Sequence, residues 1–495
     1  MTFVITQTCC KDASCVPVCP VHCIRPLPGD PDFTTAEQLY VDPATCIDCA
    51  ACLDECPVGA IHSEWDLPQE LSDYLEINAD HFTEDTVGEA PPPAPQRRKL
   101  PDGRTALLVA IVGSGPAACY AAAELSEIKG VNVSIFERLP TPFGLIDTGV
   151  APDHTNTKLI ADRFGAVLAR PNVHCYFNVD IGHDLTIAEL LQHHHAVLWA
   201  GGADDDRRLD IPGEDLPGCF AARDFVAWYN GHPAYGGHPF DLTGHRALVI
   251  GNGNVALDVA RVMARPPDAF VGTDMADHAV EALRHSAIRE IVVAARRGPE
   301  HAAYTTGELL ALERTDGAAL LASPEEAPQS DTGRRSTIIA AAARRRPTRD
   351  QRTITFRYGL SPEAINGADS VESVTFRRSD GGTETIKASL VLRAIGYRGR
   401  AVPDLPFDES TGTLPHRAGS VVDPATGAPV TGVYCAGWIK RGATGMIGSN
   451  KTDAQETVDS ILRDYAAGQL DEPAATREHL DALTRSFQAV PDRRG

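Results

Sequence analysis

Long hydrophobic runs are missing from this 495-residue sequence. No segment approaches the ~20 consecutive apolar residues that are needed to span a bilayer. The first residues, MTFVITQTCCKDASC, also lack the basic, apolar and small-residue regions of a signal peptide. We therefore expect a cytoplasmic protein without membrane insertion.

Basic residues are too few to balance the acidic ones, and the formal net charge is −22. Nucleic-acid binding requires a basic face that neutralises phosphates, so we expect no nucleic-acid partner. The hydrophobic fraction of 43% and the charged fraction of 23% are ordinary for a soluble globular protein. Because single hydrophobic cores stop growing at roughly 250 to 300 residues, the chain should divide into several domains.

Cysteine is scarce beyond residue 56, where only four of the 13 cysteines lie. The other nine fall within residues 9–56, and in a reducing compartment such a cluster indicates metal binding rather than disulfides. One run has the C-x2-C-x2-C-x3-C-P spacing of bacterial ferredoxins, formed by Cys46, Cys49, Cys52 and Cys56. A zinc site is disfavoured, since zinc sites pair two short spacings around a knuckle loop.

A second, incomplete copy of this motif precedes the first, with Asp12 at the position of the second cysteine. In such motifs three thiolates bind one cluster and the fourth binds the other. This rule predicts a [4Fe-4S] cluster on Cys19, Cys46, Cys49 and Cys52, and a second site on Cys9, Cys15 and Cys56. Three thiolates suit a [3Fe-4S] cluster, although Asp12 or, less favourably, Cys10 could complete a second [4Fe-4S] cluster. Cys23 is interpreted as structural.

Beyond a proline-rich linker (APPPAPQRRKLPDGR) the pattern changes to apolar strand, glycine turn and helix. It appears at Leu107 and again at Ala247, which is typical of an α/β protein with parallel sheets. The sequence predicts a multidomain α/β chain in which a ferredoxin-like α+β iron-sulfur domain precedes two Rossmann-like dinucleotide-binding domains. The histidine run 193–195 is not expected to bind metal, because consecutive helical residues point in different directions.

The first glycine turn has the G-x-G-x-x-A form, with Gly113 and Gly115 between a buried strand and a helix. A helix N-terminus at this place binds a pyrophosphate. The next strand ends in Glu137, where an acidic residue accepts the ribose hydroxyls of a dinucleotide. We interpret this segment as an FAD site.

The second glycine turn runs from Gly251 through Asn252, Gly253 and Asn254 to Val255, but its later strand leads into Arg296 and Arg297. Guanidinium groups cannot accept a ribose hydroxyl bond, whereas they match the geometry of a 2′-phosphate. This site is therefore predicted to bind NADPH rather than NADH.

These motifs resemble, in order and spacing, the adrenodoxin-reductase-like NADPH:ferredoxin reductases from about residue 107 to 465. They include IVGSGPA, PTPFGL, GVAPDH, LDIPGEDLPG, GNGNVALDVAR, RRGP and GWIKRGATGMIG. Joined to the N-terminal cysteine domain, the arrangement is similar to the ferredoxin-fused members of that family in actinobacteria. In the family the NADPH domain is inserted into the FAD domain.

The resemblance implies the following domains: a ferredoxin domain at 1–66, a linker at 67–104, FAD-domain parts at 105–200 and 396–480, an NADPH domain at 201–395, and a tail at 481–495. It also implies FAD contacts at Ala117, Glu137, Leu145, Val179, Trp438, Gly445, Met446 and Ile447. Arg296, Arg297 and Glu308 are implied as contacts of the adenosine phosphate and ribose. His154 is a candidate for proton handling near the flavin, and a structural role as a loop cap is an equal alternative.

The activity that follows is NADPH:ferredoxin oxidoreduction. Hydride would pass from NADPH to FAD, and single electrons would then pass to the iron-sulfur clusters and to a ferredoxin or another one-electron acceptor. We expect a monomer. The alternative is the small, electron-input subunit of a glutamate-synthase-like complex, which would need a larger catalytic partner.

Overall fold

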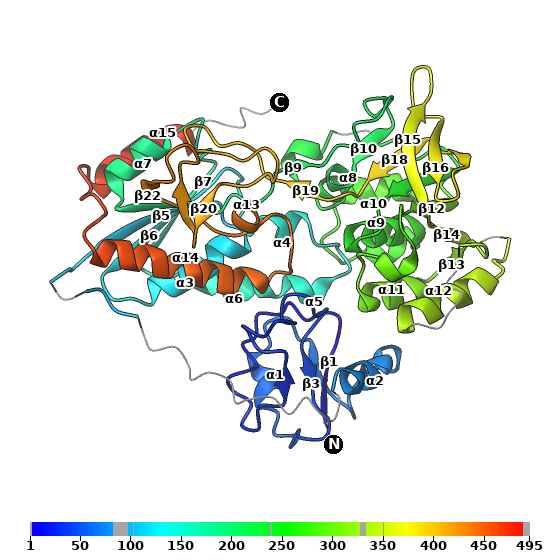
Figure 1. Cartoon of the computed structure of the whole chain (residues 1–495), viewed down its shortest axis with the longest axis horizontal. Helices are drawn as coiled ribbons and strands as arrows, with labels where there is room; N and C mark the ends of the chain where they lie inside the picture. The colour runs from blue at the N-terminus through cyan, green and yellow to red at the C-terminus, as the bar shows by residue number, and fades with distance from the viewer. Residues whose placement is uncertain are drawn as a thin grey trace. The chain divides into compact units, whose positions relative to one another are not determined.

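The computed structural model describes residues 2–82, 98–101, 103–237, 240–326, 333–349 and 351–488, with side chains as far as residue 485 (Figure 1). Most of the predicted proline-rich linker and the last part of the predicted tail, residues 489–495, lie outside the described residues. The chain divides into two compact units. The first contains residues 1–147, 156–205 and 397–495, and the second contains residues 148–155 and 206–396.

The N-terminal part of the first unit consists of two short antiparallel strand pairs and two helices. β1 pairs with β4, and β2 pairs with β3. The elements are β1 (Phe3–Ile5), β2 (Ile24–Arg25), β3 (Tyr40–Val41), α1 (Ala51–Glu55), β4 (Ile61–Ser63), a 3-10 turn (Gln69–Leu71) and α2 (Asp73–Asp80). This is the small α+β domain that the cysteine pattern predicts.

Helix α2 belongs to this domain, so the linker does not begin at residue 67 as predicted. Its Asn78 is buried, and the side-chain oxygen accepts hydrogen bonds from the backbone N–H groups of Ile5 (3.1 Å) and Val41 (3.0 Å). The Asn78 amide donates to the carbonyl of Ile5 at 2.9 Å. A buried amide satisfied in this way ties α2 to β1 and β3. The sequence concealed this role because α2 is short and the residue that ties it to the strands, Asn78, is polar.

The rest of the first unit is built on a seven-stranded sheet with the order β20-β21-β22-β8-β5-β6-β7. Its β22, β8, β5, β6 and β7 are parallel, as the alternation of strands and helices predicts. Helices α3 and α14 pack side by side (Figure 1). The strands are β5 (Leu107–Val112), β6 (Val131–Glu137), β7 (Val173–Phe177), β8 (Ala196–Trp199), β20 (His416–Arg417), β21 (Ser420–Val422) and β22 (Pro429–Cys435).

The helices of this part are mostly short. They are α3 (Pro116–Ser126), α4 (Leu145–Thr148), α5 (Thr155–Lys158), α6 (Ile160–Leu168), α7 (Ile187–His193), α13 (Trp438–Arg441), α14 (Ser449–Ala466) and α15 (Arg477–Gln488). Because α15 continues through residue 488, residues 481–488 are helical rather than part of a tail.

The second unit contains a six-stranded parallel sheet with the order β10-β18-β11-β12-β14-β13, and a three-stranded antiparallel sheet, β15-β16-β17. The strands are β10 (Cys219–Ala221), β11 (Arg246–Ile250), β12 (Glu290–Ala294), β13 (Ala318–Ala322), β14 (Arg352–Arg357), β15 (Leu360–Asn366), β16 (Ser373–Arg378), β17 (Thr383–Lys387) and β18 (Leu390–Arg393). The helices are α8 (Ala222–Tyr229), α9 (Asn254–Ala264), α10 (Asp277–Arg284), α11 (Thr306–Glu313) and α12 (Arg334–Arg344), with 3-10 turns at Pro233–Tyr235, Pro267–Phe270 and Pro299–His301.

The chain passes between the two units near the predicted crossings. The observed boundaries are 205/206 and 396/397, against predicted ones of 200/201 and 395/396, and the short strands β9 (Asp205–Asp206) and β19 (Tyr397–Arg398) lie there. The sequence did not predict that residues 148–155 also belong to the second unit, although the stretches before and after them belong to the first.

The three histidines at the end of α7 each have a different set of partners. His193 contacts His479 (Nε2 to Nδ1, 3.0 Å), and His195 accepts from the backbone N–H of Leu108 at 3.0 Å. His194 is 3% exposed, and its Nδ1–H donates to the carbonyl of Leu190 at 2.9 Å. Burial lowers the pKa of His194 to about 4.

The low pKa of His194 predicts a loss of stability in mild acid. The unfolded chain binds a proton at this residue below pH 6.5, whereas the folded chain does so only near pH 4. Stability is therefore complete above pH 6.5 and falls as the pH drops toward 4, by up to roughly 3 kcal/mol. We expect thermal unfolding of His194→Asn to depend less on pH between 7 and 5 than that of the wild type. His183→Asn is the control, since His183 is exposed; parallel curves for the wild type and His194→Asn would contradict the assignment.

Candidate functional site

The first glycine turn packs directly against the end of a neighbouring strand. Gly113 has φ +98°, and a Cβ there would lie 2.6 Å from the carbonyl oxygen of Ala200, just beyond β8. Only glycine fits such a close approach. The turn leads into α3, which begins at Pro116 directly after Gly115. Ala117 is thus in the first turn of this helix, where free backbone N–H groups and the helix dipole favour a phosphate.

Glu137 lies beside this turn at the end of β6, as predicted. It is buried, and its Oε2 accepts hydrogen bonds from the backbone N–H (3.0 Å) and hydroxyl (2.6 Å) of Ser114. Its Oε1 accepts from the N–H of Leu139 at 2.9 Å, and its backbone carbonyl accepts from the N–H of Val179 at 3.0 Å. The carboxylate is therefore fixed next to the glycine turn, in the position that binding a ribose requires.

The segment 437–447 comes from a distant part of the chain but lies against the first glycine turn. A Cβ at Gly437 would be 2.7 Å from the Cβ of Ala117. The indole N–H of Trp438 donates to the carbonyl of Thr444 at 3.1 Å, and the N–H of Met446 donates to the Ser449 hydroxyl at 3.0 Å. Within the first unit the structure thus brings both segments predicted to contact FAD together. Leu145, at the start of α4, is 37% exposed.

The second glycine turn repeats this geometry in the second unit. Gly251 has φ +124°, and a Cβ there would lie 2.2 Å from the carbonyl oxygen of Ala394, just beyond β18. Asn252 and Gly253 lead into α9, which starts at Asn254 and continues through Val255. The Asn254 side chain accepts a hydrogen bond from the N–H of Thr305 at 2.9 Å. The N-terminus of α9 therefore has the geometry expected of a second dinucleotide site.

Arg296 and Arg297 follow β12, which pairs in parallel with β11. Both are exposed, and neither forms an ion pair with another described residue. They lie just beyond the position in the second unit that corresponds to Glu137 in the first. A basic pair there is the contrast in charge that the prediction of a 2′-phosphate contact requires.

His154 belongs to a buried polar cluster within the second unit. Its Nε2 lies 3.4 Å from Oδ1 of Asp258 and 3.7 Å from Oε2 of Glu308. The guanidinium of Arg261 donates to His154 Nε2 at 2.6 Å and also bonds Asp153 and Asp258. Because arginine only donates, His154 accepts this hydrogen bond through Nε2.

Arg261 supplies the positive charge that these carboxylates need. Although burial opposes ionisation, the Arg261 guanidinium holds the pKa of Asp153 below its usual value. Burial, with Asp258 nearby, raises the pKa of Glu308, and its Oε2 has no hydrogen-bond partner among the described residues. His154, Asp258 and Glu308 have ligand atoms close enough to hold a metal ion, but the Arg261 guanidinium bonds both His154 and Asp258 and so already occupies two of these ligands. Glu308 therefore faces His154, a neighbour that the sequence did not indicate.

The N-terminal domain contains two pockets of similar size, with empty volumes of about 270 and 300 Å³. The larger is lined by Cys19, Cys46, Cys49 and Cys52, the set predicted for the [4Fe-4S] cluster, together with Cys23. Cys23 Sγ lies 3.4 Å from Cys19 Sγ. This proximity was not predicted, because Cys23 falls outside the motif.

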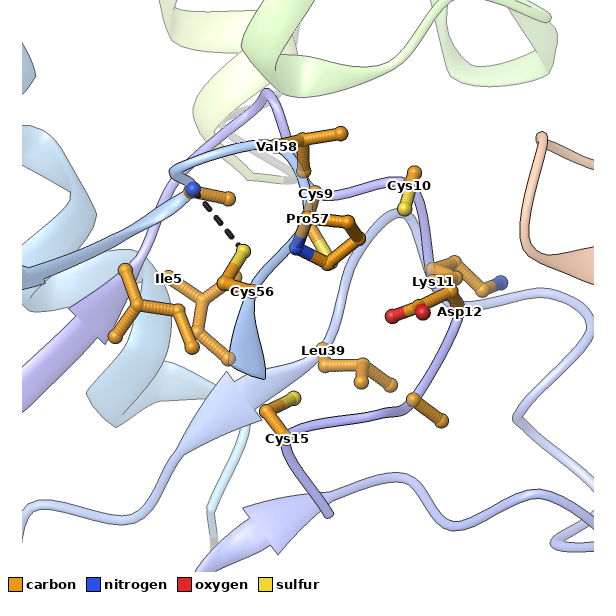
Figure 2. Close-up of a pocket in the computed structure, with 13 residues that line it drawn as sticks. Ile5, Cys9, Cys10, Lys11, Asp12, Cys15, Leu39, Cys56, Pro57 and Val58 are labelled. Atoms are coloured by element: carbon orange, nitrogen blue, oxygen red, sulfur yellow. Dashed lines mark hydrogen bonds between the residues drawn. The ribbon is translucent and has the colours of Figure 1, made fainter. Parts of the chain in front are cut away.

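The other pocket is lined by Cys9, Cys15 and Cys56, and also by Cys10 and Asp12 (Figure 2). Apart from Lys11 and Asp12 its wall is mostly apolar, with Ile5, Leu39, Pro57 and Val58 around the thiols. Burial raises the pKa of Cys9 to about 11, so this thiol would carry a proton without a cation beside it. Sulfur ligands that converge in a buried apolar wall fit an iron-sulfur cluster.

The two cysteine motifs share one backbone conformation. Left-handed φ angles occur at Lys11 (60°) and Ala13 (56°) in the first, and at the equivalent Asp48 (56°) and Ala50 (62°) in the second. Asp12 stands between its two left-handed residues as Cys49 does between the other two. The backbone thus places Asp12 where the alignment of the motifs predicts.

Asp12 is held by residues that the sequence did not single out. It is 6% exposed, and its carboxylate accepts hydrogen bonds from Ser14 Oγ (2.5 Å), Ser14 N (3.1 Å) and Arg163 of α6 (3.3 Å). Lys451 of α14 donates to the Asp12 carbonyl at 2.9 Å. No local pattern relates residue 12 to residues 163 and 451, so only the fold shows this network.

Comparison with known proteins places these sites in a family. The 4Fe-4S binding domain family matches residues 39–62, and the NAD(P)-binding Rossmann-like domain family matches residues 111–171. A protein of Mycobacterium tuberculosis named "Probable ferredoxin/ferredoxin--NADP reductase" is 47% identical over 512 residues, covering 99% of this chain and 88% of that protein. The chain belongs to the ferredoxin/ferredoxin–NADP reductase family. The adrenodoxin-reductase resemblance is confirmed by a relative at 39% identity over 73% of the chain, the mitochondrial NADPH:adrenodoxin oxidoreductase of Arabidopsis thaliana.

Solved structures agree with this assignment and with the predicted multidomain α/β fold. The structure of Mycobacterium tuberculosis FprA in complex with NADPH is 40% identical, with a TM-score of 0.72, and covers 77% of this chain and 90% of that one. The sequence of the same organism's NADPH-ferredoxin reductase FprA is 42% identical over 72% of this chain and 83% of its own length.

The contact between Gly437 and Ala117 generates a prediction for the flavin cradle. Gly437→Ala should weaken flavin retention, because its methyl group would collide with the Ala117 methyl group in the first turn of α3. Gly442→Ala is a matched control, since its φ of +84° is close to the +82° of Gly437 but a Cβ there meets nothing within 4 Å. Flavin content after purification is the measurement. Equal flavin loss in both variants would attribute the effect to backbone strain and not to this contact.

Proposed function

We propose that this chain transfers hydride from NADPH to a bound FAD and delivers electrons singly to its own iron-sulfur clusters and to a ferredoxin or another one-electron acceptor. The observation that carries the proposal is the presence, in one chain, of two glycine-turn sites with opposite ribose-side charges and a cysteine domain with two thiol-lined pockets. The full-length relationship to proteins named ferredoxin/ferredoxin–NADP reductase supports it.

FAD would be held in the first unit, by the N-terminus of α3, Glu137, Leu145, Val179 and the segment from Trp438 to Ile447. When bound, FAD would supply the chemistry that converts two-electron transfer into one-electron transfer. The residues themselves bind and orient: α3 faces the pyrophosphate, and the fixed Glu137 carboxylate accepts from the ribose. No general acid-base triad is needed for this chemistry.

NADPH would be held in the second unit by residues 252–255, at the N-terminus of α9, and by Arg296 and Arg297. That a 40%-identical structure is a complex with NADPH supports this assignment. Glu308, which the resemblance implied as a contact of the ribose, is proposed to act with His154, since the two face each other. His154 is our candidate for proton handling, and Arg261 orients its ring by donating to Nε2.

The cysteine domain would hold a [4Fe-4S] cluster on Cys19, Cys46, Cys49 and Cys52, and a [3Fe-4S] cluster on Cys9, Cys15 and Cys56. The ion pair between Asp12 and Arg163 favours the three-iron assignment, because a carboxylate already bonded by three donors is a weaker iron ligand.

The buried thiols suit a reducing compartment, and we propose that the protein acts in the cytoplasm as a monomer. None of the helices among the described residues has both the length and the apolar character needed to cross a bilayer.

The glutamate-synthase-like alternative is less well supported. Its relatives would be subunits of a larger complex, whereas this chain matches proteins named as reductases along 99% of its length. Solution mass and NADPH-dependent ferredoxin reduction by the isolated chain separate the two readings.

The arginine pair generates a prediction of cofactor preference. Replacing both Arg296 and Arg297 by Ala should weaken NADPH binding by on the order of 1.5 to 3 kcal/mol for each charge-assisted contact. Binding of NADH should be nearly unchanged, because it lacks the 2′-phosphate. Titration of each nucleotide under anaerobic conditions, followed by flavin absorbance, measures both. Equal weakening of NADPH binding and NADH binding would contradict the assignment of these two arginines to the 2′-phosphate.

Asp12 generates a prediction of cluster type. Protein isolated in air should contain about seven irons per chain and show a resonance near the free-electron value from the oxidised three-iron centre. Asp12→Cys should convert the site to a [4Fe-4S] cluster and abolish that signal, since the shared backbone places residue 12 where the other motif has Cys49. Iron counting and electron paramagnetic resonance are the measurements. Eight irons without this signal in the wild type would overturn the three-iron assignment.

A further inference from the structure

The loop from Cys10 to Ser14, here called the Asp12 loop, touches the neighbouring domain backbone to backbone within the first unit. The N–H of Gly448 donates to the carbonyl of Cys10 at 2.7 Å. A Cβ at Gly448 would lie 2.1 Å from the carbonyl carbon of Lys11 and 2.2 Å from the nitrogen of Asp12. Gly448 has an ordinary φ of −67°, so backbone conformation does not require glycine there. Glycine is required because any side chain would collide with the Asp12 loop.

This contact lies next to the segment predicted to bind the flavin. Gly448 follows Ile447 directly, and Ile447 packs against the same core that includes Cys10 and Ala13. Tyr120 of α3, the helix of the first glycine turn, is buried in the same core as Cys10 and Ala13. The loop that forms one wall of the three-cysteine pocket therefore contacts the residue that directly follows the flavin segment, and it shares a core with the helix of the first glycine turn.

Two cations fasten the loop. Arg163 of α6 bonds the Asp12 carboxylate and, at 3.1 Å, the Ser14 hydroxyl. Lys451 of α14 bonds the Asp12 carbonyl and the Ser14 hydroxyl, at 2.9 and 3.1 Å. Asp12 thus joins three elements, its own loop, α6 and α14.

The four-cysteine pocket has no comparable attachment. Its Cys49 is exposed and its Ile47 is 58% exposed. Over the described part of the chain, the hydrogen bonds of residues 42–56 stay within the N-terminal domain. One pocket is therefore fastened to the flavin domain, and the other reaches the surface.

We propose that the Asp12 loop is the port by which electrons enter the N-terminal domain, so that the three-cysteine site is reduced first and the four-cysteine site is the exit to the external acceptor. Asp12 is a positioning residue of this port and not an iron ligand. The inference rests on the proposed function. Oxidation of NADPH to NADP⁺ releases a hydride, which is equivalent to two electrons and one proton. Bound FAD would supply the change from two-electron to one-electron transfer, and the proton would be released to solvent. Cys9, Cys15 and Cys56 would hold iron that accepts one electron at a time, from ferric to ferrous.

Gly448→Ala tests the port, because its added methyl group must push the Asp12 loop away. Anaerobic stopped-flow mixing of the full-length holoprotein with NADPH resolves bleaching of the flavin from the later transfer to the clusters. We expect flavin bleaching at the wild-type rate and cluster reduction slowed roughly tenfold to a hundredfold. Iron content and the resonance of the isolated protein should not change. Gly165→Ala in α6 is the control, since the nearest atom to its Cβ is 4.0 Å away in Phe143.

Arg163→Ala combined with Lys451→Ala tests the same port without adding bulk. Cluster reduction should slow, and Arg163→Lys alone should preserve most of the rate. The wild-type rate should also fall with rising salt more steeply than that of the double variant, because partly exposed ion pairs are screened. Arg463→Ala, a change near the other end of α14, is the control and should have no effect.

Asp12→Asn separates positioning from iron binding. If Asp12 only positions the loop, the three-iron resonance and the iron content remain and cluster reduction slows. A changed resonance or iron count would make Asp12 a ligand and overturn this part of the inference. Wild-type rates of cluster reduction in both Gly448→Ala and the double variant would overturn the port. Failure of the proposed function has a different result, since NADPH would then not bleach the flavin in any variant.

Discussion

Direct contact between backbone segments, with no side chain between them, is the constraint on which the arrangement of this protein depends. At Gly113 and Gly251 the glycine turn presses on the carbonyl oxygen that follows the adjacent parallel strand, Ala200 and Ala394 respectively. Both sheets thus use the same packing solution, and in both it directs a helix N-terminus toward the edge where a dinucleotide binds. Gly448 extends the principle, because it meets the backbone of the Asp12 loop, while Gly437 makes a similarly close approach to the small side chain of Ala117. Electron transfer depends on short separations, and these four glycines are where the chain achieves them.

Buried charge is organised around cations that belong to the protein. Arg261 forms ion pairs with Asp153 and Asp258 beside His154, Arg163 forms one with the Asp12 carboxylate, and Lys451 binds the Asp12 carbonyl. Ion pairs of this kind add little net stability, because desolvation offsets the attraction, but they restrict the side chains to one arrangement. In a protein that moves hydride and electrons, such fixed geometry is more useful than extra stability.

The sequence predicted the parts whose signals are local. Strands, glycine turns and helix starts at residues 107–118 and 247–256 are encoded within a dozen residues each, and the cysteine spacing by itself assigned Cys19 and Cys56 to opposite pockets. Features that depend on distant contacts were missed. Helix α2 was taken as linker because its key residue, Asn78, is polar, and the excursion of residues 148–155 into the second unit has no local pattern. The partners of His154 and Asp12 come from helices more than a hundred residues away, so no motif could have revealed them.

The matching left-handed positions of the two cysteine loops have a consequence for how such domains diversify. Lys11 and Ala13 hold the same conformation as Asp48 and Ala50, so the two loops have left-handed residues at the same places although a carboxylate stands between them in one and a thiol in the other. Exchange of that one side chain would then change the ligands offered to a metal, and with them the midpoint potential, on a backbone of the same local conformation. In such a domain the redox properties of the two halves can diverge through single side chains.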